Sequence, residues 1–188
     1  MSARIPRVRP EQLDPDQRAL YDAIVGGPRA AGMQHFALTD DDGALNGPFN
    51  ALLLAPAAGG ALQSVGAALR YRSALTPRMR ESAILLVATH WHSAFEWHAH
   101  EGAARAAGLT EEDLAVIRAL GTPPFVDPAE VACLRVVSAL LRGDVSDDEW
   151  AAASDHLDPR LVFELSTLVG YYSTLALQLR TFRAERDE

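Results

Sequence analysis

Residues 76–100 read TPRMRESAILLVATHWHSAFEWHAH, and this stretch carries the strongest helical signal in the chain. Thr76 followed by Pro77 is typical of a helix N-terminus, because a threonine side chain accepts a hydrogen bond from a free backbone N–H and proline needs no helical donor. The apolar residues that follow predict a long helix. We place a break in it at residues 89–91 (Thr-His-Trp), because all three are weak helix formers.

Similar helix starts recur along the chain, at residues 14–17 (DPDQ), 127–130 (DPAE), 146–149 (SDDE) and 158–159 (DP). Each combines an Asp or Ser cap with a proline or an acidic first turn, as helix N-termini prefer. Alternating apolar and polar runs bounded by turn residues, which would indicate strands, are not found in the sequence. The sequence therefore predicts an all-α protein with about seven or eight helices.

Two segments of the chain resemble each other, AARAAGLTEEDLAVIRAL at 103–120 and SALLRGDVSDDEWAAASDHL at 138–157. Each runs from a helix end through a glycine, Gly108 or Gly143, to a Thr or Ser cap and an acidic first turn. This pattern is compatible with a duplicated helical hairpin and also with two independent, well-capped helices. Both interpretations stay open.

No linker or shift in composition divides the chain, so we expect one domain over residues 1–188. In this organisation an N-terminal helix and an irregular loop occupy residues 1–47, a motif-bearing core occupies 48–120, and C-terminal helices occupy 121–188. The stretch 26–48 is rich in Gly and Asp. Loops of this length often act as lids or as partner contacts.

The composition excludes several classes of partner and chemistry. A formal net charge of -8 and scattered arginines argue against binding to a nucleic-acid backbone. No apolar run reaches the roughly 18–20 residues of a membrane span, and the N-terminal sequence lacks the apolar region of a secretory signal. We therefore expect a cytoplasmic protein without a membrane or nucleic-acid partner. Cys133 is the only cysteine, which excludes intramolecular disulfides.

The densest run of side chains suited to acid/base chemistry lies at residues 90–100, which hold four of the six histidines. On a continuous helix, His92, Glu96 and His100 share one stripe, and Ser93 lies close to it. A carboxylate can orient an imidazole that donates or accepts a proton. We therefore predict Ser93, Glu96 and His100 as catalytic residues, with Glu96 orienting His100, and His92 as a substrate-binding residue.

Other uses of these residues are also compatible with the pattern. Glu96 with His92 or His100 could supply two metal ligands, and a third would have to come from another helix or subunit. Along a helix, His92 and His100 are about 12 Å apart, too far to bind one ion. The histidines could also line a small-ligand pocket without catalysing a reaction. We expect no cofactor.

Glu81 is a further catalytic candidate whose position depends on the predicted break. On one unbroken helix, Glu81 and Glu96 would be about 22 Å apart, because each residue adds about 1.5 Å. The two could share a site only if the helix breaks between them or if a second subunit contributes. In a continuous helix, Glu81 would instead pair with a neighbouring arginine such as Arg78 or Arg80.

The rest of a substrate pocket is predicted from single residues. Asn50 follows a Gly-Pro pair at a helix start, where it could cap the helix or bind substrate. Tyr171 lies on the last helix, on the same face as Glu164, and could donate a hydrogen bond to a bound oxygen. Gly170 in the middle of that helix suggests close packing against a neighbouring helix, because Gly costs about 1 kcal/mol relative to Ala there.

The segments PRMRESAIL (77–85), FEWHAH (95–100) and AAGL (106–109) resemble the carboxymuconolactone decarboxylase-like family, which also contains the alkylhydroperoxidase AhpD group. The resemblance is clearest over residues 48–120. It implies an AhpD-like all-helical fold and a cofactor-free lyase, usually a trimer or hexamer of identical subunits. The nominal reaction of the family releases CO2 from a carboxylated muconolactone.

In the peroxidase branch of the family, a glutamate, a CxxC pair and a histidine have the spacing of Glu81, residues 93 and 96, and His100. Here Ser93 and Glu96 occupy the two cysteine positions, and neither can form the thiolate that peroxide chemistry requires. A peroxidase is therefore the least favoured function. The resemblance implies an acid/base enzyme acting on a small lactone or carboxylated carbonyl compound. A metal-dependent hydrolase or isomerase and a non-catalytic binding module are the alternatives.

Overall fold

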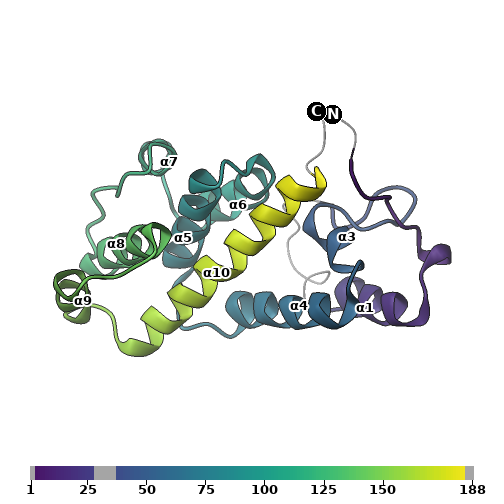
Figure 1. The fold of residues 1–188 in the computed structure, drawn as a ribbon. Helices are drawn as coiled ribbons and strands as arrows, with labels where there is room; N and C mark the ends of the chain where they lie inside the picture. The colour runs from purple at the N-terminus through teal and green to yellow at the C-terminus, as the bar shows by residue number, and fades with distance from the viewer. Residues whose placement is uncertain (1–2, 28–36, 185–188) are drawn as a thin grey trace. The chain divides into compact units, whose positions relative to one another are not determined.

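A computed structural model describes residues 3–27 and 37–184 of the chain. These residues contain nine α-helices, one short 3-10 helix and no strand, apart from an isolated bridge between Thr39 and Leu45 (Figure 1). The prediction of an all-α fold is confirmed, and the described residues hold one helix more than the upper number expected. None of the helices in these residues is long and apolar enough to cross a membrane.

The elements are, in chain order, η1 (Pro10–Gln12), α1 (Pro15–Val25), α3 (Pro48–Leu52), α4 (Pro56–Tyr71), α5 (Pro77–His90), α6 (Ala94–Ala106), α7 (Glu111–Arg118), α8 (Pro128–Arg142), α9 (Asp147–Ser154) and α10 (Pro159–Phe182).

The chain forms two compact units, and it passes from the first to the second just before α5 and back to the first within α10. The described residues up to Arg72 and those from Leu177 onward make the first unit, and Ser73–Ala176 make the second. The boundary before α5 falls inside the segment 48–120 that we predicted as one motif-bearing core. The organisation of residues 1–188 as a single domain stays a prediction.

The first unit is built around α1, α3 and α4. Its core includes the buried side chains of Leu20, Ile24, Phe49 and Leu52. Gly59 of α4 allows this packing, because a Cβ atom at that position would lie only 2.3 Å from the backbone oxygen of Leu52. The two helices α3 and α4 can therefore approach each other only with glycine at this point.

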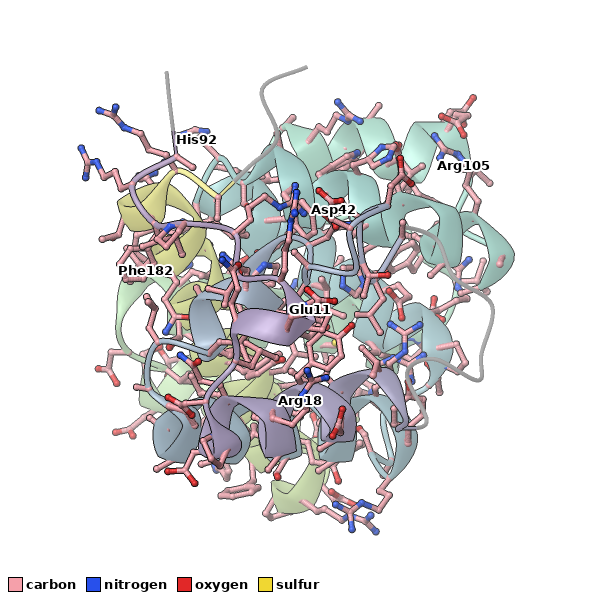
Figure 2. The ribbon with its side chains drawn as sticks, turned by 90° about the vertical axis from the view of Figure 1, so that its right-hand side faces the viewer. Glu11, Arg18, Asp42, His92, Arg105 and Phe182 are labelled. Atoms are coloured by element: carbon pink, nitrogen blue, oxygen red, sulfur yellow. The ribbon has the colours of Figure 1, made fainter. Side chains whose placement is uncertain are left out.

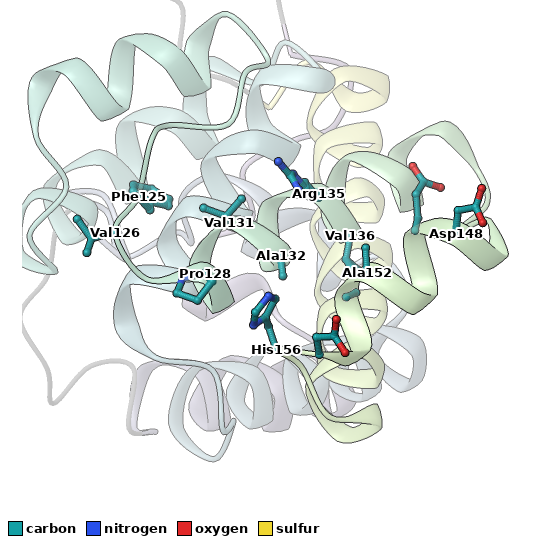
Figure 3. Close-up of a pocket in the computed structure, with 13 residues that line it drawn as sticks. Phe125, Val126, Pro128, Val131, Ala132, Arg135, Val136, Asp148, Ala152 and His156 are labelled. Carbon is teal, nitrogen blue, oxygen red and sulfur yellow. The ribbon is translucent and has the colours of Figure 1, made fainter.

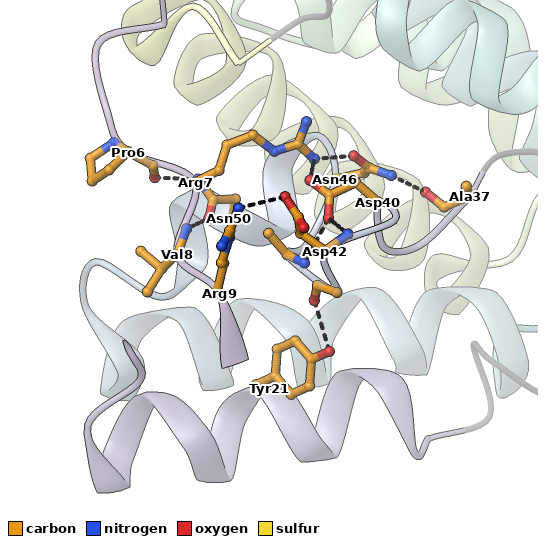
Figure 4. A network of polar contacts seen from close by, with 12 residues as sticks. Pro6, Arg7, Val8, Arg9, Tyr21, Ala37, Asp40, Asp42, Asn46 and Asn50 are labelled. Carbon is orange, nitrogen blue, oxygen red and sulfur yellow. Dashed lines mark hydrogen bonds and ion pairs between the residues drawn. The ribbon is translucent and has the colours of Figure 1, made fainter. Parts of the chain in front are cut away.

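A network of polar contacts orders residues 37–47 (Figure 4). The carboxylate of Asp40 accepts hydrogen bonds from the backbone N–H groups of Asp42 and Ala44, and it forms an ion pair of 3.1 Å with Arg7. The hydroxyl of Tyr21 donates to the backbone oxygen of Gly43 over 2.8 Å. These contacts fold part of the predicted irregular stretch 26–48 against its own unit, and residues 28–36 of that stretch lie outside the described residues.

In the second unit, α5 packs against α6, α7 and α8. The hydroxyl of Thr76 caps α5 by accepting a hydrogen bond from the backbone N–H of Met79, as the sequence predicted. All residues from 81 to 88 are buried, so α5 is the central helix of this unit. The predicted break is confirmed close to its expected place, because α5 ends at His90 and α6 begins at Ala94.

The two similar segments form equivalent connections between helices. Gly108 after α6 and Gly143 after α8 both have positive φ angles, of 92° and 104°. Thr110 and Ser146 then cap α7 and α9, each within a reciprocal capping box. The likeness of the segments therefore extends to their local structure, which agrees with duplication and with two independent caps alike.

Candidate active site

The centre of the candidate site is a buried pair of side chains, Glu81 from α5 and His100 from α6. The ring nitrogen Nδ1 of His100 lies 2.8 Å from Oε2 of Glu81. Glu81 is 3% exposed and His100 is 8% exposed, so water has little access to their contact. An ion pair or charge-assisted hydrogen bond is stronger in such an environment than at the protein surface.

Glu81 is held as a carboxylate by its neighbours. Burial alone would raise the pKa of Glu81. His100 and Arg80 oppose this effect, each through its charge and a hydrogen bond, and together they outweigh it. The pKa of Glu81 is therefore below its usual value. Nε of Arg80 donates to Oε1 of Glu81 over 3.1 Å. Because an ionised carboxylate only accepts hydrogen bonds, we assign the proton between the two residues to Nδ1 of His100.

This assignment leaves Nε2 of His100 as the nitrogen that can exchange a proton. Within residues 3–27 and 37–184, Nε2 has no hydrogen-bond partner from the protein. An imidazole that is held at one nitrogen and open at the other is the arrangement that acid/base catalysis uses. The pair therefore has the geometry of a proton-transfer site.

The helix break brings Glu81 and His100 together. The two residues are 19 positions apart in the chain, and the reversal between α5 and α6 returns His100 to the level of Glu81. The sequence left two uses of Glu81 open, a place in the site after a break and an ion pair with a nearby arginine. Both occur in the structure, because one carboxylate oxygen binds His100 and the other binds Arg80.

Ser93 and Glu96 lie at the start of α6, and both are buried. Ser93 is the N-cap residue, and its hydroxyl accepts a hydrogen bond of 3.4 Å from the backbone N–H of Glu96. Glu96 precedes His100 by one helical turn, so Ser93, Glu96 and His100 share a face of α6 as predicted. The carboxylate on Nδ1 of His100, however, is that of Glu81, whereas we had predicted Glu96 for this position. The catalytic roles of Ser93 and Glu96 stay predictions.

The placement of His92 on the same helical stripe is wrong. His92 lies in the turn between α5 and α6, is exposed, and has a positive φ of 53° (Figure 2). The spacing of His92, Glu96 and His100 does not place them on one helical face, because α6 begins only at Ala94, after His92. Its predicted role in substrate binding gains no support from its position.

Tyr172 of α10, which the sequence analysis did not select, lies against His100. Its ring centroid is 5.3 Å from that of His100, and the two rings meet edge to face. Tyr171, which we had selected, packs instead on Tyr172 with a centroid distance of 5.1 Å. Helical periodicity does not show which face of α10 meets α6, and the role of Tyr171 in substrate binding stays a prediction.

Two further residues of α10, Glu164 and Gly170, are placed by the structure. Glu164 supports the segment before α5, since its carboxylate accepts hydrogen bonds from the Ser73 hydroxyl (2.6 Å) and the Ala74 N–H (2.8 Å). The prediction of close packing at Gly170 is wrong. Gly170 is exposed, and a Cβ atom built at this position would have no described atom within 4 Å.

Asn50 does not cap its helix, so that part of its prediction is wrong. The N-cap of α3 is Gly47, whose φ is positive. The buried amide of Asn50 instead donates to the backbone oxygen of Pro6 over 3.0 Å and accepts from the N–H of Val8 over 3.4 Å. Asn50 therefore fastens the N-terminal segment within the first unit, while Glu81 and His100 belong to the second.

Cys133 on α8 is buried and cannot take over the role of the absent cysteine pair. It is 0% exposed, and burial, with a smaller contribution from the charge of Glu130, raises the pKa of its thiol to about 12. At neutral pH it is therefore a protonated thiol, which is a poor nucleophile toward peroxides.

The part of the chain that the structure describes contains no group of three or more His, Cys, Asp or Glu side chains placed to hold a metal ion. The predicted pairing of Glu96 with His92 as two metal ligands gains no support, because His92 lies in the exposed turn before α6. A metal site at Glu96 and His100 would need a donor from elsewhere.

A groove of about 630 Å³ lies along α8 and α9 (Figure 3). Its lining is mostly apolar and includes Val131 and Ala152, together with Arg135 and His156. None of the residues predicted for the site lines this groove, so it is separate from the Glu81–His100 pair.

Comparisons with known proteins agree with this fold. Residues 56–139 match the model of the Carboxymuconolactone decarboxylase family, a segment that contains both Glu81 and His100. The crystal structure of a protein of unknown function from Agrobacterium tumefaciens, proposed there as an antioxidant defence protein AhpD, has a TM-score of 0.64 to this chain at 19% identity. The similarity covers 74% of this chain and 97% of that one, and at this identity it shows the fold alone. None of the curated proteins gives a significant match. Residues 56–139 are therefore similar to the Carboxymuconolactone decarboxylase family, and the all-helical fold is similar to that of the Agrobacterium protein.

Proposed function

We propose that this protein is a cofactor-independent acid/base enzyme that acts on a small lactone or carboxylated carbonyl compound. The observation that carries this proposal is the buried contact of 2.8 Å between Glu81 and Nδ1 of His100. The match of residues 56–139 to the family model supports the substrate class, and the absence of a cysteine pair in the sequence argues against thiol redox chemistry.

In the proposed mechanism, Nε2 of His100 exchanges a proton with a carbon or oxygen atom of the substrate. The charge that then develops on the imidazole is balanced by the carboxylate of Glu81, which also keeps the ring in one orientation. The low exposure of the pair strengthens this electrostatic support, because little water competes with it. General acid/base catalysis of this kind contributes roughly 100- to 10,000-fold to a rate.

Proton exchange tests the proposal more directly than a complete reaction. Lactones with an acidic C–H bond, and a carboxylated muconolactone, would be incubated with the protein in D2O. Deuterium incorporation would be followed by NMR, and CO2 release would be measured in parallel. We expect His100→Gln to reduce either rate by roughly 100-fold or more, since it removes the exchanging nitrogen.

His98→Gln is the matched control, because His98 lies on the same helix two residues away and its side chain is 73% exposed. It should leave the rates unchanged. Equal rates for wild-type protein and His100→Gln would contradict the proposal. Tight lactone binding without any exchange would favour a non-catalytic binding module.

The subunit organisation is part of the proposal and rests on the resemblance of residues 56–139 to the family. We propose a homo-oligomer, a trimer or a hexamer, that takes a small molecule as its substrate. Light scattering coupled to size-exclusion chromatography measures the mass directly, and a mass equal to one 20.3 kDa chain at micromolar concentration would contradict it.

A further inference from the structure

The imidazole of His100 has contacts on two sides, one with α5 and one with α10. On the α5 side, its Nδ1 lies 2.8 Å from the carboxylate of Glu81. On the α10 side, the ring of Tyr172 meets it edge to face, with 5.3 Å between the ring centroids and 86° between the ring planes. The acid/base function proposed above uses the first contact and gives no role to the second.

The hydrogen bond to Glu81 does not by itself fix the orientation of the imidazole. A histidine ring turns about two side-chain torsions, and the outer torsion has a broad distribution rather than three sharp minima. One hydrogen bond holds the position of Nδ1 and leaves the plane of the ring free to tilt about that atom. Nε2 lies on the opposite side of the ring and moves with each tilt. A second contact is needed to keep this nitrogen in one place.

Tyr172 is well placed to supply this second contact, because it is itself held by its neighbours. It is 9% exposed, and the ring of Tyr171 packs on it at 87°, with 5.1 Å between the centroids. The next residue, Ser173, accepts a hydrogen bond of 2.8 Å from Nε1 of Trp91, which is the C-cap of α5. This turn of α10 is therefore attached both to α6, through the ring of His100, and to the end of α5.

We propose that Tyr172 is a positioning residue, whose ring fixes the plane of the His100 imidazole and so keeps Nε2 directed at the reacting atom of the substrate. This inference rests on the acid/base function proposed above. The ring of Tyr172 performs this role rather than its hydroxyl, because the contact with His100 is one between rings. A misplaced catalytic group costs up to about 100-fold in rate, so loss of the ring should slow proton transfer strongly.

Two substitutions at this position separate the ring from the rest of the side chain. Tyr172→Phe keeps the ring and removes the hydroxyl, whereas Tyr172→Leu is apolar and has no ring. Circular dichroism and thermal unfolding would check that each variant is folded. If leucine prevents folding, Tyr172→Met takes its place in every comparison, because a flexible methionine fills irregular gaps in a core.

Tyr21→Leu is the matched control for the loss of a buried tyrosine. Tyr21 is 8% exposed, close to the value for Tyr172, but its hydroxyl donates to the backbone oxygen of Gly43 within the first unit. This variant loses a similar amount of buried aromatic surface and keeps the ring beside His100. It therefore separates the proposed positioning from a general loss of stability.

The kinetic measurement is deuterium exchange into a carboxylated muconolactone in D2O, with kcat and KM determined separately. We expect Tyr172→Leu to lower kcat by about 10- to 100-fold and to change KM by less than about threefold, because misalignment slows proton transfer more than it weakens binding. Tyr172→Phe and Tyr21→Leu should keep kcat within about threefold of the wild type. An unchanged kcat in folded Tyr172→Leu, or an equal loss in Tyr172→Phe, would overturn the inference.

A second measurement needs no substrate. NMR relaxation of the ring carbons in protein labelled with 13C-histidine reports how strongly each imidazole is ordered. We expect the His100 ring to be ordered in the wild type and in Tyr172→Phe, and to become mobile in Tyr172→Leu. His98, whose side chain is 73% exposed, provides the mobile reference. A wild-type His100 ring as mobile as that of His98, or a ring that stays ordered in Tyr172→Leu, would contradict the positioning role.

The two measurements distinguish this inference from the proposed function. A His100 ring that becomes mobile in Tyr172→Leu, found together with exchange that is unchanged in His100→Gln, would support the positioning contact and contradict the acid/base function. Exchange that is lost in His100→Gln, found together with a His100 ring that stays ordered in Tyr172→Leu, would contradict the positioning role alone.

Discussion

At the scale of single residues, the site depends on a carboxylate that is ionised although it is buried. Glu81 has a lowered pKa because His100 and Arg80 together outweigh the effect of burial. A lowered pKa in the folded state means that ionisation of Glu81 stabilises the fold above the ordinary glutamate pKa of 4.5. This stabilisation is lost as the pH falls through the lowered pKa, because both states are then protonated.

The variant Glu81→Gln should therefore be less stable than the wild type at pH 7, by about 1–3 kcal/mol, which is typical of a hydrogen bond to a charged group. The difference should shrink as the pH is lowered below 4.5, where wild-type protein loses the same contribution. Urea unfolding at pH 7 and at a series of acidic values measures it. A difference that does not depend on pH would contradict the ionised assignment of Glu81.

Cys133 gives a second prediction at this scale. Because its thiol is buried and has a pKa raised to about 12, native protein should react with a disulfide reagent such as Ellman's reagent far more slowly than a free thiol. One equivalent should react rapidly once urea has unfolded the chain. Rapid reaction of the folded protein would show that Cys133 is accessible.

At the scale of helices, the start signals in the sequence were reliable. The helices α1, α5, α8, α9 and α10 begin within the predicted cap sequences, because capping is a local interaction between residues that are close in the chain. The break after α5 was also predictable, since it follows weak helix formers. The left-handed conformation of His92 was not, because it depends on how two helices pack after the turn.

The partner of His100 could not be assigned from the sequence for a related reason. Helical periodicity relates residues within one element, and it led us to Glu96, one turn before His100. Glu81 lies on another helix and meets His100 only through the packing of α5 on α6. Tyr172 was missed in the same way, since its contact with His100 comes from α10.

Replacement by alanine should change the stability of the protein in opposite directions at two helical glycines, Gly170 and Gly59. Gly170→Ala should stabilise the protein by about 0.5–1 kcal/mol, because the position is open and alanine is the better helix former. Gly59→Ala should destabilise it by roughly 1–3 kcal/mol, because the new Cβ would overlap the backbone of Leu52. Thermal unfolding of both variants measures these effects. Destabilisation by Gly170→Ala would indicate that another chain packs on that face of α10.

At the scale of the whole molecule, the chain combines an all-helical fold, similar to that of the Agrobacterium protein, with a site that has no reactive thiol. Ser93 and Glu96 occupy the positions of the cysteine pair, and Cys133 lies buried on another helix. We expect the protein to consume hydrogen peroxide no faster than buffer when dithiothreitol is the reductant. Peroxide consumption that is saturable and proportional to protein concentration would contradict the assignment to non-thiol chemistry.

The turn at His92 also has a consequence for how this fold could change. A non-glycine residue with a φ of 53° carries about 1–2 kcal/mol of conformational strain, which a glycine would not. The reversal between α5 and α6 is therefore maintained against the local preference of the chain by the packing on either side of it. Local and global preferences therefore conflict at the turn that brings the acid/base pair together, and selection for greater stability alone would favour glycine at this position.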